Sequence, residues 1–142
     1  MSRVKIQIPD EKAQFEISIP LRITDMNYGN HLGNDKILSL FHEARVQALS
    51  KLNCNELDIG DKVSLIMGDV MIRFRAEGFY GDITYVKIWF REFKTHSFQV
   101  YYQLINKKDE KIIAEGKTGM VAFDYNARKV ASIPASFVEK CT

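Results

Sequence analysis

Residues 22–52 contain the side chains of this sequence that are best suited to chemistry. The acidic, amide and imidazole residues of their first part are Asp25, Asn27, Asn30, His31 and Asn34. A carboxylate can activate water or attack a carbonyl group, and amide and imidazole groups can position or polarise one. These polar residues come immediately before the longest helical pattern of the sequence, so we interpret them as a functional loop that leads into a helix.

A helix is predicted from residue 37 onward because apolar residues recur three and four positions apart. These are Ile37, Leu38, Phe41, Ala44, Ala48, Leu49 and Leu52, which together form one helix face. Asn34 or Asp35 is expected to cap this helix, and Gly33 allows the chain to turn before it. A helix start has unpaired N–H groups and a partial positive charge, so the amides around Gly33 and Asn34 are candidate oxyanion donors.

The remaining sequence is typical of strands joined by short polar turns. Apolar alternation and β-branched residues predict strands at residues 4–8, 15–19, 63–75, 83–93, 98–105, 111–123 and 130–133. Pro20 is expected either to interrupt or to end the second of these strands before residues 21–23. A bulge is expected at Gly68. Short turns between long strands indicate antiparallel pairing, and a single long helix implies that the sheet curls around it. The expected fold is therefore α+β, with one domain over residues 1–142.

Residues 83–93 are apolar on both faces, whereas one helix can cover only one face of a sheet. The other surface needs a partner, which predicts a homodimer that pairs sheet to sheet or edge to edge.

Composition narrows the class of protein. The chain has 142 residues, a formal net charge of +2 and only two cysteines. These values are expected of a soluble cytoplasmic protein with reduced thiols, and they give no argument for nucleic-acid binding. No apolar run is long enough to span a membrane. No metal or cofactor is expected, because the three histidines lack ligand spacing and no glycine-rich phosphate loop is present.

The run RITDMNYGNHLGNDKILSLFHEAR resembles the signature of hotdog-fold thioesterases of the 4-hydroxybenzoyl-CoA thioesterase-like group. That pattern is approximately R-x-x-D-x-D-x-x-G-H-V-N-N, followed by a helix ending in E-x-A-R. The residues at matching positions are Arg22, Asp25, His31, Asn34, Glu43, Ala44 and Arg45. The second half is similar to the long strands and turns of the family, so the resemblance covers nearly the whole chain. It implies a curved antiparallel sheet wrapped around one helix, a homodimer or dimer of dimers, and hydrolysis of an acyl-CoA or acyl-carrier-protein thioester.

The sequence departs from this pattern at the position of a second carboxylate. Asn27 stands where many members carry an acid that acts as nucleophile or base, and Gly33 replaces the first of the paired asparagines. We therefore take Asp25 as the first candidate for the catalytic carboxylate and Glu43 as the second. His31 is expected either to orient the thioester or to hold the loop together. Asn27 is expected either to position water or to form a turn.

Three residues of the helix have contrasting positions on a helical wheel. Glu43 points away from the apolar stripe, toward water or toward the cleft of a second copy. Arg45 falls inside the stripe, so it must pair with an acid or with carbonyl groups. His42 lies at the edge of the stripe and is expected to be structural. For the phosphates of coenzyme A, the cationic candidates near strand ends are Arg73, Arg75, Arg91, Lys94 and His96.

Two alternatives to thioester hydrolysis remain open. Asp25, Asn27 and His31 are similar to the D-x-N-P-x-H motif of hotdog enoyl-CoA hydratases, although the proline is missing and the spacing is one residue longer. Asn27 in place of a carboxylate also suggests a protein that binds acyl thioesters without turnover.

Overall fold

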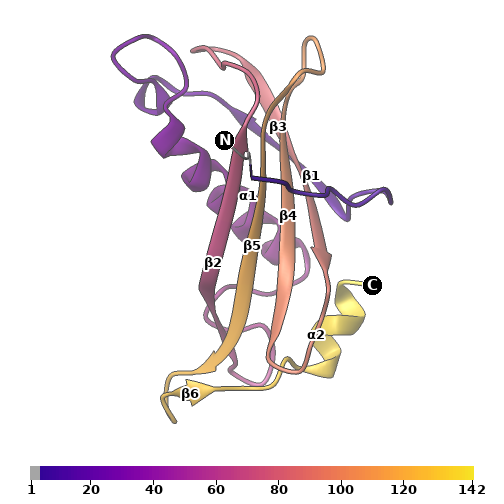
Figure 1. Cartoon of the computed structure of the whole chain (residues 1–142). Coiled ribbons are helices and arrows are strands. Elements are labelled where there is room, and N and C mark those ends of the chain that lie inside the picture. The colour runs from indigo at the N-terminus through magenta and orange to yellow at the C-terminus, as the bar shows by residue number, and fades with distance from the viewer. Residues whose placement is uncertain (1–3) are drawn as a thin grey trace.

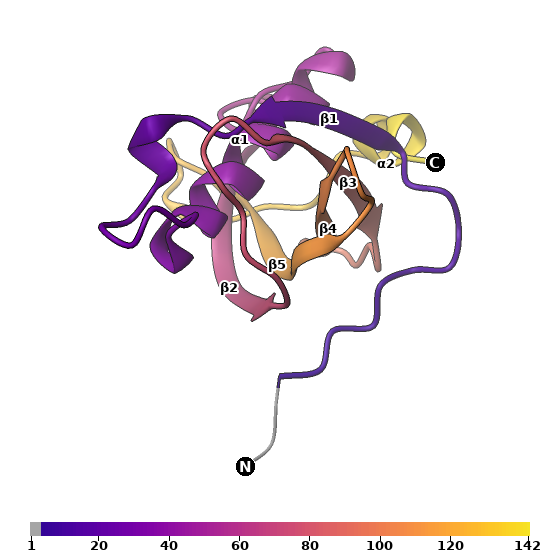
Figure 2. The ribbon, with the colours of Figure 1, turned by 90° about the horizontal axis from the view of Figure 1, so that it is seen from above.

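The protein is built as one curved antiparallel sheet that wraps around a long helix (Figures 1 and 2). The structure is a computed structural model that describes residues 4–142. Its strands are β1 (Phe15–Pro20), β2 (Ser64–Phe74), β3 (Ile83–Arg91), β4 (Ser97–Asn106), β5 (Ile112–Asp124) and β6 (Lys129–Val130). The order across the sheet is β1-β3-β4-β5-β2, and β6 pairs with β5. Helix α1 (Ile37–Lys51) lies on the concave side, and α2 (Ala135–Lys140) ends the chain. The α+β prediction is confirmed.

Helix α1 packs on the sheet through the predicted apolar stripe. Phe41 is fully buried and stacks on Tyr102 of β4, with 4.6 Å between the ring centroids. The same ring lies directly on Gly116 of β5, where an added Cβ would be only 2.4 Å from Phe41 Cε2. A glycine at this position therefore lets α1 approach the sheet closely, and the first turns of the helix are fixed in place.

Arg45 extends from α1 into this core, and the prediction that it pairs with an acid is confirmed. Its Nε donates to Glu56 Oε2 at 3.3 Å, and its Nη1 donates to the Tyr102 hydroxyl at 2.8 Å. The Tyr102 hydroxyl is also hydrogen-bonded to the hydroxyl of Thr118, and burial raises the pKa of Tyr102. His42 lies 2.6 Å from the other oxygen of Glu56. This network fixes the second half of α1 to β4, to β5 and to the connector that precedes β2.

The convex face of β3 is covered in part by the chain itself. The Trp89 indole N–H donates to the Glu11 carbonyl at 2.8 Å, so the N-terminal segment crosses over a buried tryptophan. The strand predicted at residues 4–8 is wrong, because this segment has no ladder partner and runs as irregular chain over the sheet. The N-terminal segment therefore covers part of the apolar convex face of β3, and a partner chain is not needed to cover all of it.

One further local prediction is wrong, and one element was not predicted. Strand β1 ends at Pro20, which was one of the two expected outcomes, and the chain then turns into the 3-10 helix Ile23–Asp25. Neither Asn34 nor Asp35 caps α1 with its side chain, since a 3-10 turn at Asn34–Lys36 leads directly into the helix. Helix α2 was not expected, because six residues are too few for a visible apolar period. It is held by Phe137, which packs against Phe90, Phe93 and Phe98.

The bulge predicted at Gly68 is confirmed, since the register between β2 and β5 shifts between Met67 and Asp69. The carboxylate of Asp69 accepts the Gly119 N–H at 3.0 Å and so replaces one ladder bond. The other strands agree with the predicted ranges to within a few residues.

Candidate functional site

Asp25 lies at the beginning of the polar loop and is almost completely buried, with 3% of its surface exposed. Its Oδ2 accepts the backbone N–H of Arg22 at 2.8 Å, and the Arg22 guanidinium lies 3.4 Å from Oδ1. The hydrogen bond and the charge of Asp25 raise the pKa of Arg22. The Asp25 carbonyl oxygen accepts the N–H of Gly33 at 3.0 Å. Asp25 thus ties the two ends of the loop together.

Asn27 organises the centre of the loop. Its Oδ1 accepts the N–H groups of Gly29 at 2.9 Å and His31 at 3.2 Å, and its own N–H donates to the His31 carbonyl at 2.8 Å. Asn30 adopts a left-handed backbone with φ of 65°. Such a closed loop presents its tip to solvent, and Tyr28 at the tip is fully exposed.

His31 joins this loop to the turn between β2 and β3. Its ring packs on Phe79 with a centroid distance of 5.3 Å, and the neighbouring Leu32 N–H donates to the Gly78 carbonyl at 2.7 Å. The Nδ1 atom lies 3.4 Å from Glu77 Oε2 but makes no hydrogen bond. This contact is therefore an ion pair only when His31 is protonated.

The start of the helix is the part of the loop with free polar groups. Among residues 4–142, the N–H groups of Asn34 and Asp35 donate to no partner, whereas the Gly33 N–H is already bonded to Asp25. The side chains of Asn34 and Asp35 are both exposed. Unpaired N–H groups at a helix start can donate hydrogen bonds to a carbonyl oxygen or an anion. The structure thus provides donors at Asn34 and Asp35, while Gly33 shapes the turn.

Glu43, the second predicted acid, is exposed on α1, and its carboxylate accepts a hydrogen bond from Gln47 at 2.7 Å. It lies nine residues after Asn34, which is about 13 Å along a helix. Its charge is also a minor cause of the raised pKa of Arg22. Within one chain the structure does not bring Glu43 to the free amides.

The predicted coenzyme-binding cations fall at two opposite ends of the sheet. Arg73 and Arg75 lie at the end of β2 near the loop, and Arg75 pairs with Glu115 at 3.2 Å. Lys94 and His96 follow the far end of β3, about 26 Å away for a strand of this length. There His96 Nδ1 lies 2.9 Å from the Ala131 carbonyl oxygen. These four residues therefore do not form one binding surface within the chain.

Arg91, the remaining predicted cation, lies at the same far end as Lys94 and His96. Its guanidinium Nε is 3.6 Å from the Glu11 carboxylate, so it is paired within the chain.

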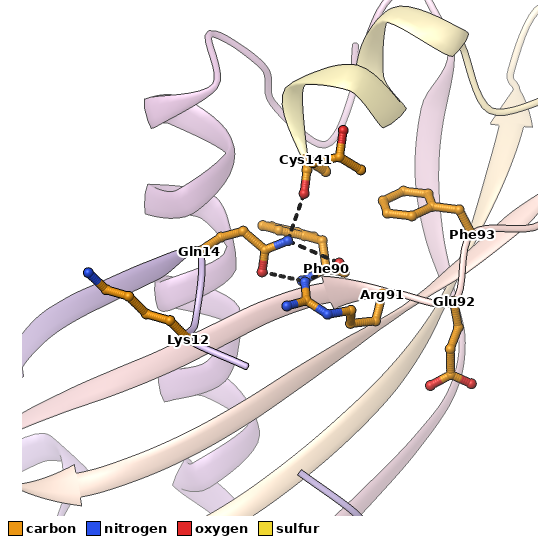
Figure 3. A pocket seen from close by; sticks show the side chains of 8 residues that line it. Lys12, Gln14, Phe90, Arg91, Glu92, Phe93 and Cys141 are labelled. Atoms are coloured by element: carbon orange, nitrogen blue, oxygen red, sulfur yellow. Dashed lines mark hydrogen bonds between the residues drawn. The ribbon is translucent and has the colours of Figure 1, made fainter. Parts of the chain in front are cut away.

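Cavities of similar volume lie at both ends of the sheet. One of about 520 Å³ lies beside the loop, where Phe79, Glu77, Lys108 and Lys111 are among the lining residues. Another of about 500 Å³ lies at the far end, between the end of β3 and α2 (Figure 3). There the Gln14 amide bridges the backbone of Phe90 and the carbonyl of Cys141. The far cavity is thus framed by groups that hold the fold together.

Residues 4–142 contain no group of three or more His, Cys, Asp or Glu placed to hold a metal ion. No helix in the same range has the length and apolar character needed to cross a membrane.

Residues 21–141 match the sequence model of the thioesterase-like superfamily, and the chain belongs to this family. The match includes the whole loop, α1 and all the strands from β2 onward. No curated protein sequence shows a significant match.

Several solved structures share the fold. A 1,4-dihydroxy-2-naphthoyl-CoA thioesterase from Synechocystis superposes with a TM-score of 0.81 at 22% identity, over 89% of this chain and 94% of its own. A gentisyl-coenzyme A thioesterase superposes with a TM-score of 0.78 at 19% identity, over 90% of this chain and 100% of its own. A thioesterase superfamily protein from Jannaschia superposes with a TM-score of 0.78 at 19% identity, over 90% of this chain and 83% of its own. The fold is therefore the hotdog fold that the sequence predicts.

Proposed function

We propose that the protein hydrolyses a coenzyme A or acyl-carrier-protein thioester at the start of α1. The observation that carries this proposal is the pair of unbonded N–H groups at Asn34 and Asp35, at the end of the loop that bears the family resemblance. Such groups can polarise the thioester carbonyl and stabilise the negative oxygen that forms when water attacks. Among the predicted donors we assign this role to Asn34, because the Gly33 N–H is already bonded.

We propose an aromatic acyl group as the first substrate class to test. The surface around the loop carries exposed aromatic side chains at Tyr28, Phe79 and Tyr80, and aromatic rings pack favourably on one another. Two structures of the same fold are described as 1,4-dihydroxy-2-naphthoyl-CoA and gentisyl-coenzyme A thioesterases. The cavity beside Phe79, with Lys108 and Lys111 in its lining, is the place where the coenzyme would extend.

We propose that the working unit is at least a homodimer. Strand β2 is an edge strand of the described sheet, and Val70, Met71 and Phe74 on it are 40%, 39% and 50% exposed. An exposed apolar edge is a template for pairing with another strand, and the same edge of a second copy is self-complementary. In that arrangement the loop and its apolar surroundings would be partly covered by the partner.

The experiment is a thiol-release assay on the purified protein with matched panels of aroyl-CoA, short-chain and long-chain acyl-CoA, and acyl-carrier-protein thioesters. We expect release of free thiol, fastest with an aroyl group. Absence of thiol release with every thioester, from a folded protein, would refute the proposal.

Hydrolysis is preferred over hydration because Asp25 and His31, the pair needed for a hydratase, are each engaged in other contacts. Asp25 is buried against Arg22, and His31 packs on Phe79. A crotonyl thioester separates the two reactions, since a hydratase would consume the enone without releasing thiol. Binding without turnover is the second candidate, because Asn27, which stands at the family's carboxylate position, is occupied in holding the loop. Tight binding without thiol release would support that alternative.

A further inference from the structure

The proposed reaction needs a base for the attacking water, and neither acid predicted from the sequence is well placed to supply it. The Asp25 carboxylate is buried and bonded to Arg22. Glu43 is bonded to Gln47 and lies about 13 Å along the helix from Asn34. Glu77, in the turn beside the loop, lies 3.4 Å from His31 Nδ1, and Asp82 accepts the Phe79 N–H and an Asn106 amide hydrogen. Each of these four carboxylates already has a polar partner.

We infer that Asp35 is this general base, an assignment that rests on the proposed function. Its side chain is exposed, and within residues 4–142 no hydrogen bond or ion pair to its carboxylate is present. The carboxylate folds back over Gly33, so that an added Cβ on Gly33 would lie 2.5 Å from Asp35 Oδ1. The backbone of Gly33 has φ of −69°, which any residue can adopt. The space that a Cβ would take at Gly33 is thus occupied by the end of the flexible Asp35 side chain.

At this position the Asp35 carboxylate, which can accept a proton, is next to N–H groups that can donate to a carbonyl oxygen. The unbonded amides of Asn34 and Asp35 and the carboxylate of Asp35 all belong to the same 3-10 turn. We therefore expect a carbonyl bound at the amides to lie within reach of water that the carboxylate holds. No second chain has to supply the base, which distinguishes Asp35 from Glu43.

The chemical step follows from this arrangement. Water attacks the carbonyl carbon while Asp35 takes one of its protons, and the C=O electron pair moves to the oxygen held by the amides. The tetrahedral intermediate re-forms the carbonyl and breaks the C–S bond. The departing thiolate takes the proton from Asp35, which leaves a carboxylic acid, a thiol and the original carboxylate. The net reaction consumes one thioester and one water molecule and needs no other reactant.

The test compares Asp35→Asn with Asp61→Asn, a matched change at an exposed aspartate beyond the other end of α1. Loss of a general base lowers kcat by about 100-fold or more. We expect this loss in Asp35→Asn, with KM within about threefold and the acidic limb of the kcat–pH profile abolished. Asp61→Asn should behave as the wild type. A change at an exposed helix start should lower the melting temperature of Asp35→Asn by no more than about 3 °C.

Gly33→Ala provides a second, geometric test. Its Cβ displaces the carboxylate but leaves the charge and the backbone conformation in place, so kcat should fall by about tenfold. Glu43→Gln, which replaces the rival carboxylate on α1 by an amide, tests whether Glu43 rather than Asp35 is the base.

Asp35 is excluded if Asp35→Asn keeps more than about a third of the wild-type kcat, or if Glu43→Gln alone abolishes turnover. A wild-type protein that releases no thiol overturns the proposed function and this assignment together. If the wild type releases thiol and the Asp35→Asn variant is also active, the assignment of Asp35 is wrong while the proposed function stands.

Discussion

The two ends of α1 differ in whether the backbone N–H groups are hydrogen-bonded. At the far end, the N–H groups of Leu52, Asn53 and Cys54 all donate to helix carbonyls, and Arg45 and Glu56 satisfy one another in the interior. At the start, the N–H groups of Asn34 and Asp35 are unbonded and exposed. The first N–H groups of a helix have no intrahelical partner, and where they are exposed they are available to water or to a ligand. One helix thus has an end that holds the fold and an end available for chemistry.

The largest effect on stability is expected between these ends, at Phe41. Phe41→Ala would leave a cavity between α1 and the sheet, because the ring is fully buried between Tyr102 and Gly116. The free energy of unfolding should fall by about 3–5 kcal/mol, measured by urea denaturation. Phe41→Leu, which keeps most of the volume, is the control and should lose much less. A loss below about 1 kcal/mol in Phe41→Ala would show that the core is not tightly packed here.

A smaller loss is expected at the far end of the helix. Arg45→Ala removes the partner of Glu56, a carboxylate that is still 24% exposed. The cost should be about 2–3 kcal/mol, less than for a fully buried pair because water reaches Glu56. Tyr102→Phe, which removes one hydroxyl from the same network, should cost about 1 kcal/mol. Thiol release per folded molecule should stay unchanged in both variants, and a specific loss of turnover would contradict the separation of the two ends.

The smallest effect concerns alkaline pH at the buried thiol of Cys141. Burial raises its pKa to about 12, above the value of about 8.5 expected in the unfolded chain. Between these values the unfolded chain loses the proton and the folded chain keeps it, so stability falls as pH rises. From pH 8 to about pH 9.3 this group should remove about 1 kcal/mol. Urea midpoints should therefore drop less in Cys141→Ala, and an identical drop in both proteins would refute the assignment.

The sequence predicts the framework of this protein well because the framework depends on periodic patterns. The apolar stripe of α1 and the alternation in the long strands lead directly to the α+β fold, and the buried position of Arg45 follows from the same wheel. The segment at residues 4–8 has the alternation of a strand but pairs with no strand of the sheet. A local pattern does not reveal whether a segment finds a neighbour to pair with.

The candidate site is less predictable because it depends on which polar groups are already bonded. Asp25 and Asn27 have the residue types of a catalytic loop, yet the structure uses both of them to close that loop. Asp35 was expected only as a helix cap. Its sequence signal is that it directly follows Gly33 and Asn34 at a helix start, but only the coordinates show that its carboxylate is free and folded over the glycine.

The most direct test of the central claim is to observe where a thioester carbonyl binds. A non-hydrolysable ketone analogue of an aroyl-CoA, added to isotopically labelled protein, would report the amide groups it contacts through their NMR chemical shifts. We expect the largest shifts at the N–H groups of Asn34 and Asp35, with little change around Leu52 to Cys54. Shifts concentrated at the far end of α1, or in the cavity beside α2, would contradict the account.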